Sequence, residues 1–144
     1  MKVVVQRSLD ASVLVDGKIV GKIDKGLVLL VGFTLGDNLE KIEWMAKKIV
    51  SLRIFDDENK IMNKSLLDVK GSILSISQFT LYASCEKGNR PSYKDALIAP
   101  LAKPLYEKFN EVLSKYCHVE TGIFQADMKV SLINDGPVSI ILKR

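Results

Sequence analysis

Residues 3 to 33 read VVVQRSLDASVLVDGKIVGKIDKGLVLLVGF, and this stretch decides the fold class because apolar, often β-branched residues recur in short bursts along it. Such residues favour strands, and strands are predicted at Val3–Leu9, Ser12–Val15, Lys18–Asp24 and Leu27–Phe33. Asp16-Gly17 joins the second strand to the third and is typical of a type I′ turn, in which both residues take positive φ. The chain is therefore expected to begin as an antiparallel sheet.

The next segment predicts an amphipathic helix. Asp37 is a suitable N-cap, and Glu40 follows three residues later, as in a capping box. Apolar residues recur at helical spacing, at Leu39, Ile42, Met45, Ala46, Ile49 and Val50. The lysines of the segment fall largely on the other face, where we expect solvent: Lys41, Lys47 and Lys48.

The rest of the chain predicts a central strand, a second helix and closing strands. After a polar surface loop at 56–59, β-branched and aromatic residues dominate from Ile73 to Tyr82 and predict a strand in the middle of the sheet. The second helix pattern is expected to start near Lys103, because Pro104 fits best in a first turn. Strands are predicted again at 118–121, 128–133 and 138–142.

This order of elements predicts one α/β domain spanning residues 1–144. Strands come first, two main helices lie in the middle and strands return at the end, which favours mixed and antiparallel sheets with the helices packed on one side. A doubly wound parallel sheet would alternate strands and helices throughout. A chain of 144 residues also has the usual size of a single domain.

Composition indicates an ordinary globular protein. Hydrophobic residues make up 47% and charged residues 26% of the chain, close to globular averages. The longest apolar run, residues 26–35, is far shorter than the roughly 20 residues that a membrane span needs. The N-terminus lacks the pattern of a secretory signal. We expect a cytoplasmic protein with no membrane partner.

The sequence gives no sign of a metal or of a bound cofactor. Cys85, Cys117 and a single histidine, His118, provide neither a disulfide framework nor zinc-ligand spacing. The chain has no P-loop and no dinucleotide-binding GxGxxG, so ATP and NAD chemistry are not expected. A catalytic triad would have to use His118, and no nucleophile-elbow or paired-carboxylate motif accompanies it. We expect His118 at a strand edge.

Three segments are candidates for chemistry, and each has a plain structural alternative. Ser77 to Leu81, SQFTL, puts polar residues into an otherwise apolar strand, but simple alternation could turn Gln78 and Thr80 to solvent. Asn134 to Pro137, NDGP, could equally be an ordinary hairpin turn. Lys87 to Tyr93, KGNRPSY, could contact phosphate or be a solvated connection. The net charge of +4 is compatible with a polyanionic partner and is common without one.

Taken together, SQFTL and the C-terminal NDGPV resemble the two signature motifs of the D-aminoacyl-tRNA deacylase family. The resemblance is colinear over the whole chain. The further matching segments are Val5-Gln6-Arg7, Ala11-Ser12-Val13, Leu52 to Phe55, Lys87 to Ser92, Thr121-Gly122 and Ala126-Asp127-Met128. Two departures occur: Ser139 stands where the family usually has threonine, and Pro104 interrupts a helix that relatives usually start earlier.

The resemblance implies an enzyme that hydrolyses the ester joining a D-amino acid to the terminal adenosine of tRNA, with glycyl-tRNA as a further candidate substrate. It implies a tRNA partner rather than DNA. It also implies a homodimer in which the Gly136-Pro137 element of one subunit, with a cis peptide bond, enters the pocket of the other. Such an element could exclude L-amino acids by backbone contact alone.

The resemblance also assigns roles to residues. The catalytic group is Ser77, Gln78, Phe79 and Thr80, with backbone N–H groups around Phe79 and Thr80 as donors to the oxyanion. The chiral-selectivity group is Gly136, Pro137, Asn134 and Arg7, with Arg7 holding the element through its guanidinium donors. The tRNA-binding group is Lys87, Arg90 and Met128.

Alternatives remain at the level of mechanism and of function. The motifs contain no convincing general base, which fits the family view that the ribose 2′-hydroxyl of the tRNA assists the reaction. A rival mechanism uses Thr80 as a covalent nucleophile, which would need an adjacent base. A non-catalytic tRNA-binding module of the same fold is the alternative function, and a plain oligomerisation domain is a third possibility.

Overall fold

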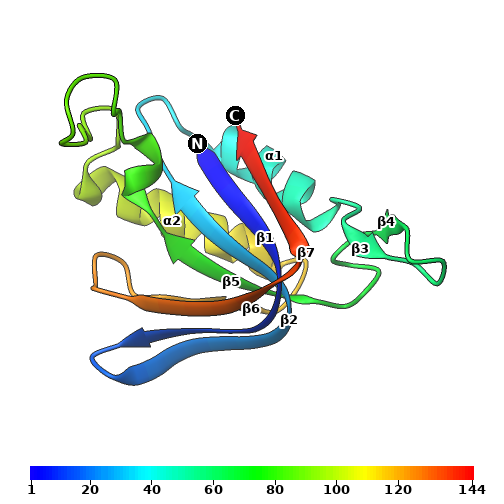
Figure 1. The fold of residues 1–144 in the computed structure, drawn as a ribbon. Coiled ribbons are helices and arrows are strands. Elements are labelled where there is room, and N and C mark those ends of the chain that lie inside the picture. Colours follow the sequence, from blue (N-terminus) through cyan, green and yellow to red (C-terminus); the bar gives the residue numbers. More distant parts are fainter.

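The structure is a computed structural model that describes residues 1–144 (Figure 1). Its elements are β1 (Lys2–Val15), β2 (Lys18–Gly32), α1 (Leu39–Val50), β3 (Phe55–Asp56), β4 (Met62–Lys64), β5 (Ser72–Ser77), the 3-10 helix η1 (Phe79–Tyr82), α2 (Ala99–Ser114), β6 (Val119–Thr121) and β7 (Lys129–Lys143). No helix is long and apolar enough to cross a membrane.

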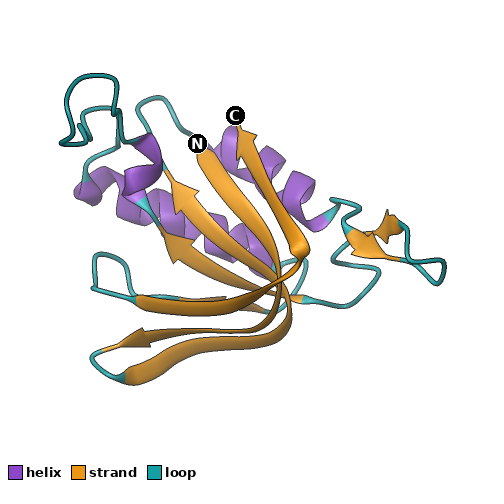
Figure 2. Ribbon diagram, viewed as in Figure 1, coloured by secondary structure: helices purple, strands orange, loops and turns teal.

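The main sheet is mixed and the helices cover one of its faces, as the sequence predicts. Five strands lie in the order β6-β5-β2-β1-β7, while β3 and β4 form a separate small sheet. β1 is antiparallel to both of its neighbours, whereas β5 runs parallel to β2 and to β6. α1 and α2 lie side by side behind the upper part of the sheet (Figure 2).

The first four predicted strands are in fact two long, bent strands. Asp16 and Gly17 both have positive φ, 49° and 74°, so the predicted turn between β1 and β2 is confirmed. The predicted gaps coincide with irregularities inside the strands, at Asp10 (φ 44°) and Gly26 (φ 154°). A Cβ on Gly26 would lie 1.8 Å from the Ser72 carbonyl oxygen, so only glycine allows β2 and β5 to meet there.

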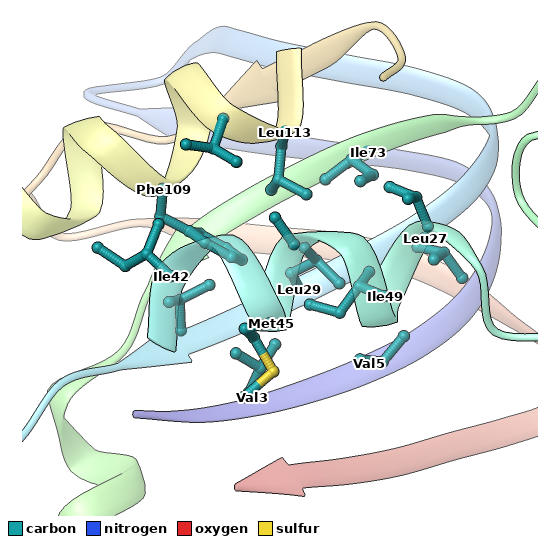
Figure 3. Packing of buried hydrophobic residues seen from close by; sticks show 14 of the residues in the cluster. Val3, Val5, Leu27, Leu29, Ile42, Met45, Ile49, Ile73, Phe109 and Leu113 are labelled. Carbon is teal, nitrogen blue, oxygen red and sulfur yellow. The ribbon is translucent and has the colours of Figure 1, made fainter. Parts of the chain in front are cut away.

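The bent sheet has a hydrophobic core on each face. Leu27, Leu29 and Val31 of β2 face the helices, whereas Val28 of the same strand packs on the opposite side, as the two-residue period of a strand requires. Figure 3 shows α1 and α2 packing against β1, β2 and β5 through this larger core. The smaller core fills the fold of the sheet and comprises Ala11, Val13, Ile23, Val28, Leu74 and Ile76.

The starts of both helices differ from the prediction. Asn38 is the N-cap of α1, and its Oδ1 accepts a hydrogen bond from Lys41 N at 3.1 Å. The side chain of Asp37 is instead buried, where it accepts from Thr34 N at 2.9 Å and pairs with the α-ammonium group of Met1. α2 begins at Ala99 rather than near Lys103, because Pro100 occupies its first turn and Pro104 is tolerated inside it.

The two motif segments also differ from their predicted local structure. The central strand ends at Ser77, and η1 follows where the strand was expected to continue to Tyr82. The segment Asn134 to Pro137 is not a hairpin turn, because β7 runs through it without a break. It is a large bulge: Gln6 pairs with Ser139 and Ser8 with Asn134, so residues 135–138 lie opposite Arg7 alone.

Candidate active site

A groove of about 640 Å³ opens beside η1 and the start of α2. Val31 and Ile76, from the last paired positions of β2 and β5, are among its lining residues, so the groove lies at the ends of two rigid central strands. Aromatic side chains and a methionine line its walls: Phe79, Tyr93, Phe124 and Met128. Most of the lining is apolar, which is the usual character of a small-molecule site. The polar lining residues are Ser77 and Gln78 of the motif segment, Gln125, and Asp127, whose exposed carboxylate is paired with Lys129 at 2.8 Å.

η1 forms because the backbone changes partner at Gln78. Gln78 N still donates to Val31 O at 2.7 Å, whereas the next bonds, from Leu81 N to Gln78 O and from Ala83 N to Thr80 O, close 3-10 turns. The first N–H groups of a helix have no partner within it, and here they belong to Phe79 and Thr80. A Cβ on Gly32 would lie 3.0 Å from Gln78 O, so the small residue lets η1 pack close to β2.

The side chains of the first motif separate into two environments. Ser77, Gln78 and Phe79 line the groove, and the Phe79 ring is 56% exposed and packs edge-on against Tyr93 at 5.1 Å between centroids. Thr80 does not line the groove, and its hydroxyl accepts a hydrogen bond from the Gln78 amide. An amide donor cannot remove a proton, so this contact does not activate Thr80 as a nucleophile.

Residues behind the groove fix the end of β5. Tyr106 of α2 donates from its hydroxyl to Ser75 O at 2.8 Å, and Gly122 N donates to the same oxygen at 3.1 Å. Burial raises the pKa of Tyr106, so this hydroxyl stays a neutral donor at physiological pH. A Cβ on Gly122 would lie 2.4 Å from Met128 Sδ, so this glycine makes room for Met128 in the groove wall.

The second motif is held from beneath by Arg7, which is only 6% exposed. Its Nε donates to Asp135 O at 3.0 Å and lies 3.1 Å from the Asp135 carboxylate. Its Nη1 donates to Ile54 O at 2.8 Å and to Asp56 Oδ1 at 3.3 Å. One planar guanidinium therefore ties the bulge of β7 to the segment that precedes the small sheet.

The side chain of Asn134 closes the bulge from within. Its Oδ1 accepts from Val138 N at 2.9 Å, and its Nδ2 donates to Ser139 Oγ at 2.9 Å. Serine keeps the hydroxyl that this contact needs, so the departure at Ser139 leaves the bulge closed. Gly136 and Pro137, joined by a cis peptide bond, are exposed at its tip. A Cβ on Gly136 (φ 126°) would lie 3.0 Å from Arg7 Nη2.

The structure does not bring the two motifs together within one chain. Gly136, Pro137, Asn134 and Arg7 do not line the groove that contains Ser77, Gln78 and Phe79. Among the residues assigned to tRNA, Met128 lines the groove. Lys87 and Arg90 lie in an exposed loop, closed by hydrogen bonds between the backbones of Ser84 and Ser92, next to the groove residue Tyr93.

Sequence reasoning missed part of the groove lining. Tyr93 ends a segment singled out for its charge, but its ring gave no sign of facing Phe79. The start of α2 was missed because its first turn was expected four residues later. Phe124 and Gln125 lie between segments that matched the family pattern, and that position was the only available signal. The lining residues to which no site role was assigned are Val31, Gly32, Phe33, Ile76, Tyr93, Ala96, Leu97, Ile98, Ala99, Ala102, Phe124, Gln125, Ala126, Asp127 and Val130.

Comparison with known proteins gives matches over the whole chain. The family model described as D-Tyr-tRNA(Tyr) deacylase matches residues 4–143. The D-aminoacyl-tRNA deacylase of Fervidobacterium nodosum is 58% identical over 143 residues, which cover 99% of this chain and 96% of that protein. The structure of c-Myc DNA Unwinding Element Binding Protein superimposes with a TM-score of 0.94 at 40% identity, covering 100% of this chain and 99% of the other.

A more distant structure shares the fold. A probable eukaryotic D-amino acid tRNA deacylase superimposes with a TM-score of 0.83 at 17% identity, covering 98% of this chain and 97% of the other. The architecture is thus retained where little of the sequence is.

Replacement of Arg7 by lysine tests the support of the bulge. A lysine ammonium is a point donor and cannot reach Asp135, Ile54 and Asp56 together, so Arg7→Lys should lower the free energy of unfolding by about 2 kcal/mol. Arg53→Lys is the matched control, because Arg53 donates from an exposed position to Asn63 O at 2.8 Å. Its effect should stay within about 0.5 kcal/mol. Urea unfolding measures both, and equal losses would contradict a supporting role for Arg7.

Proposed function

The chain belongs to the D-Tyr-tRNA(Tyr) deacylase family, and we propose that residues 1–144 act as one deacylase domain whose groove holds the ester to be cleaved. The protein is a hydrolase that cleaves the ester bond of D-aminoacyl-tRNA, releasing the free D-amino acid and tRNA as a proofreading step of translation. Because its substrate is tRNA, the proposed place of action is the cytoplasm.

The reaction is proposed to occur at the start of η1, because this turn lies beside the groove. Ester hydrolysis passes through a tetrahedral intermediate whose oxygen becomes negative and needs preorganised donors. The N–H groups of Phe79 and Thr80 are adjacent, have no partner within η1 and belong to a segment that lines the groove. We assign them to the oxyanion. Ser77 and Gln78 would orient the ester from the same wall.

The attacking water is activated by the substrate in this proposal. Thr80 Oγ1 is occupied by the Gln78 amide, and the imidazole of His118 is exposed and hydrogen-bonded to Glu120 at 2.8 Å. Neither arrangement supplies a base for a threonine nucleophile. The 2′-hydroxyl of the terminal ribose lies next to the ester in any aminoacyl-tRNA, so it is the group best placed to assist. The protein positions the ester and stabilises its oxyanion.

Selection against L-amino acids is assigned to the bulge of a partner subunit. Gly136 and Pro137 are exposed, they are absent from the groove of their own chain, and Arg7 and Asn134 hold them from two sides. A rigid backbone placed against the α-carbon of the substrate would clash with an L side chain and leave a D side chain free to point outward. Glycyl-tRNA has no side chain and would pass the same barrier.

This separation within one chain supports the proposed homodimer. Each chain has a groove that its own bulge does not line, so a second copy is needed to place a bulge against the groove. Met128 in the groove wall, with Lys87 and Arg90 in the neighbouring loop, would then contact the end of the tRNA. The two cations can meet phosphate oxygens, whereas Met128 offers an apolar surface.

The first test follows ester loss from D-tyrosyl-tRNA and L-tyrosyl-tRNA. We expect rapid loss of the D-ester and a rate for the L-ester that is lower by at least about 100-fold, because a backbone clash costs several kcal/mol. Equal rates would refute chiral selection. No loss of either ester, with tRNA binding retained, would favour the non-catalytic tRNA-binding module.

The second test separates substrate assistance from a threonine nucleophile. Thr80→Val removes the hydroxyl and keeps the backbone N–H, so single-turnover deacylation should fall by less than about 10-fold, with Thr80→Ser as the control that keeps the hydroxyl. Removal of a true nucleophile costs several orders of magnitude. Abolished turnover in Thr80→Val, together with an aminoacyl-enzyme trapped in the wild type, would establish the rival mechanism.

The third test concerns the composite site. The solution mass should be twice the 16.0 kDa of one chain, and the activity per chain should fall on dilution in step with the dimer fraction. Sedimentation and rate measurements over the same concentration series check this. A fully active species of 16.0 kDa would rule out the cross-subunit barrier.

A further inference from the structure

Two lysines lie directly opposite each other at the paired ends of β1 and β7. Lys2 and Lys143 are register partners in the antiparallel ladder, with Lys2 half-buried and Lys143 exposed. Like charges at directly opposite positions destabilise a sheet. Neither lysine takes part in an ion pair, and the nearby carboxylate of Asp37 is already paired with Met1 and Lys41. The fold therefore places two lysines without ion-pair partners at opposite positions.

The same two lysines line a second hollow, of about 370 Å³, on the far side of η1 from the groove. Tyr82, Ala83, Thr34 and Asp95 complete its lining. The Thr34 hydroxyl donates to the backbone oxygen of Asp95 at 2.6 Å, and the exposed Asp95 carboxylate forms no ion pair with either lysine. An anion entering this hollow would meet two ammonium groups that form no ion pair, with one carboxylate, that of Asp95, on the same lining.

Lys2 is oriented before any ligand arrives. Its Nζ donates to Leu81 O at 2.7 Å and lies 4.8 Å from the centre of the Tyr82 ring. One of its three N–H donors is thus used, and two remain. The Tyr82 hydroxyl is buried without a hydrogen-bond partner, and burial raises the pKa of Tyr82 to about 12. The ring stays neutral and offers Lys2 only its π-face.

η1 separates this hollow from the groove. Phe79 at its first position lines the groove, and Tyr82 at its last position lines the hollow, followed by Ala83. Phe79 and Tyr82 are separated by three residue steps of the 3-10 helix, about 6 Å in all, which is close to the spacing of neighbouring nucleotides along a strand. Figure 1 shows both ends of the chain, and with them the ends of β1 and β7, beside each other on this side of the molecule.

We propose that Lys2 and Lys143 bind a backbone phosphate of the tRNA acceptor strand, one or two nucleotides before the ester held in the groove. The inference rests on the proposed function of the groove. Two further cations lie near the ends of the chain: Arg144 is 4.9 Å from the centre of the Trp44 ring and Lys48 is 6.0 Å from it. The preceding part of the strand could meet these two cations.

The test measures the binding of deacylated tRNA as a function of salt. Each phosphate contact contributes about 0.7 to 0.9 to the slope of log K against log salt concentration. Lys143→Gln should reduce that slope by about 0.7 and weaken binding several-fold at low salt, and Lys143→Arg should restore most of it. Lys18→Gln is the matched control, because Lys18 is exposed at the far tip of the β1–β2 hairpin and should leave the slope unchanged.

A stability measurement accompanies the binding curves. Removal of one of two opposed like charges should raise Tm by about 1 °C in Lys143→Gln, which shows that the variant is folded and that the charge pair is costly in the free protein. An unchanged salt slope in Lys143→Gln, or an equal loss in Lys18→Gln, would overturn the proposal. Deacylated tRNA has no ester, so this result does not depend on whether the wild-type protein hydrolyses D-tyrosyl-tRNA, which is measured separately.

Discussion

Strand β1 is the constraint on which the rest of the structure depends, because it pairs along both of its edges. β2 occupies one edge and β7 the other, over nearly the full length of the strand. Its side chains therefore reach both cores, with Val3 and Val5 facing the helices and Ala11 and Val13 filling the fold of the sheet. Because β1 is fixed on both edges, a segment that pairs with it is held rigidly as well.

The bulge of β7 shows how this rigidity is used. Residues 135–138 lie opposite Arg7 alone in the pairing of β7 with β1, so the pairing on either side fixes the two ends of the bulge while its tip projects. Arg7 is itself a β1 residue, buried and bound to two carbonyl oxygens on different segments. A barrier made of backbone needs this kind of support, since discrimination between mirror-image substrates fails if the barrier can yield. In the proposed mechanism the oxyanion donors are backbone groups as well, so main chain performs both the selection and the stabilisation.

The sequence predicted the parts of the fold that depend on local pattern. The type I′ turn at Asp16-Gly17, the apolar face of α1 and the mixed sheet follow from residue type and spacing. The predictions from local pattern were wrong where tertiary contacts determine the local structure. Asp37 has the chemistry of an N-cap, but burial against Met1 takes its carboxylate and leaves the cap to Asn38. SQFTL has strand propensity to its end, but the close approach to Gly32 turns the chain into η1. The motif residues could be identified by resemblance, whereas their separation on the surface could only be seen in three dimensions.

Lys2 links the proposed phosphate site to η1, which carries the proposed oxyanion donors. The lysine that would meet the phosphate already donates to Leu81 O, within the same four-residue turn that presents the N–H groups of Phe79 and Thr80 to the groove. A phosphate drawn to Lys2 would therefore be positioned relative to η1 rather than to a flexible loop. The distance from the phosphate to the oxyanion donors is then set by one turn of backbone anchored on β1 and β2. Such an arrangement uses binding energy from a part of the tRNA that does not react to place the part that does. It would also give a physical reason for tolerating opposed lysines, since a bound phosphate would relieve their repulsion.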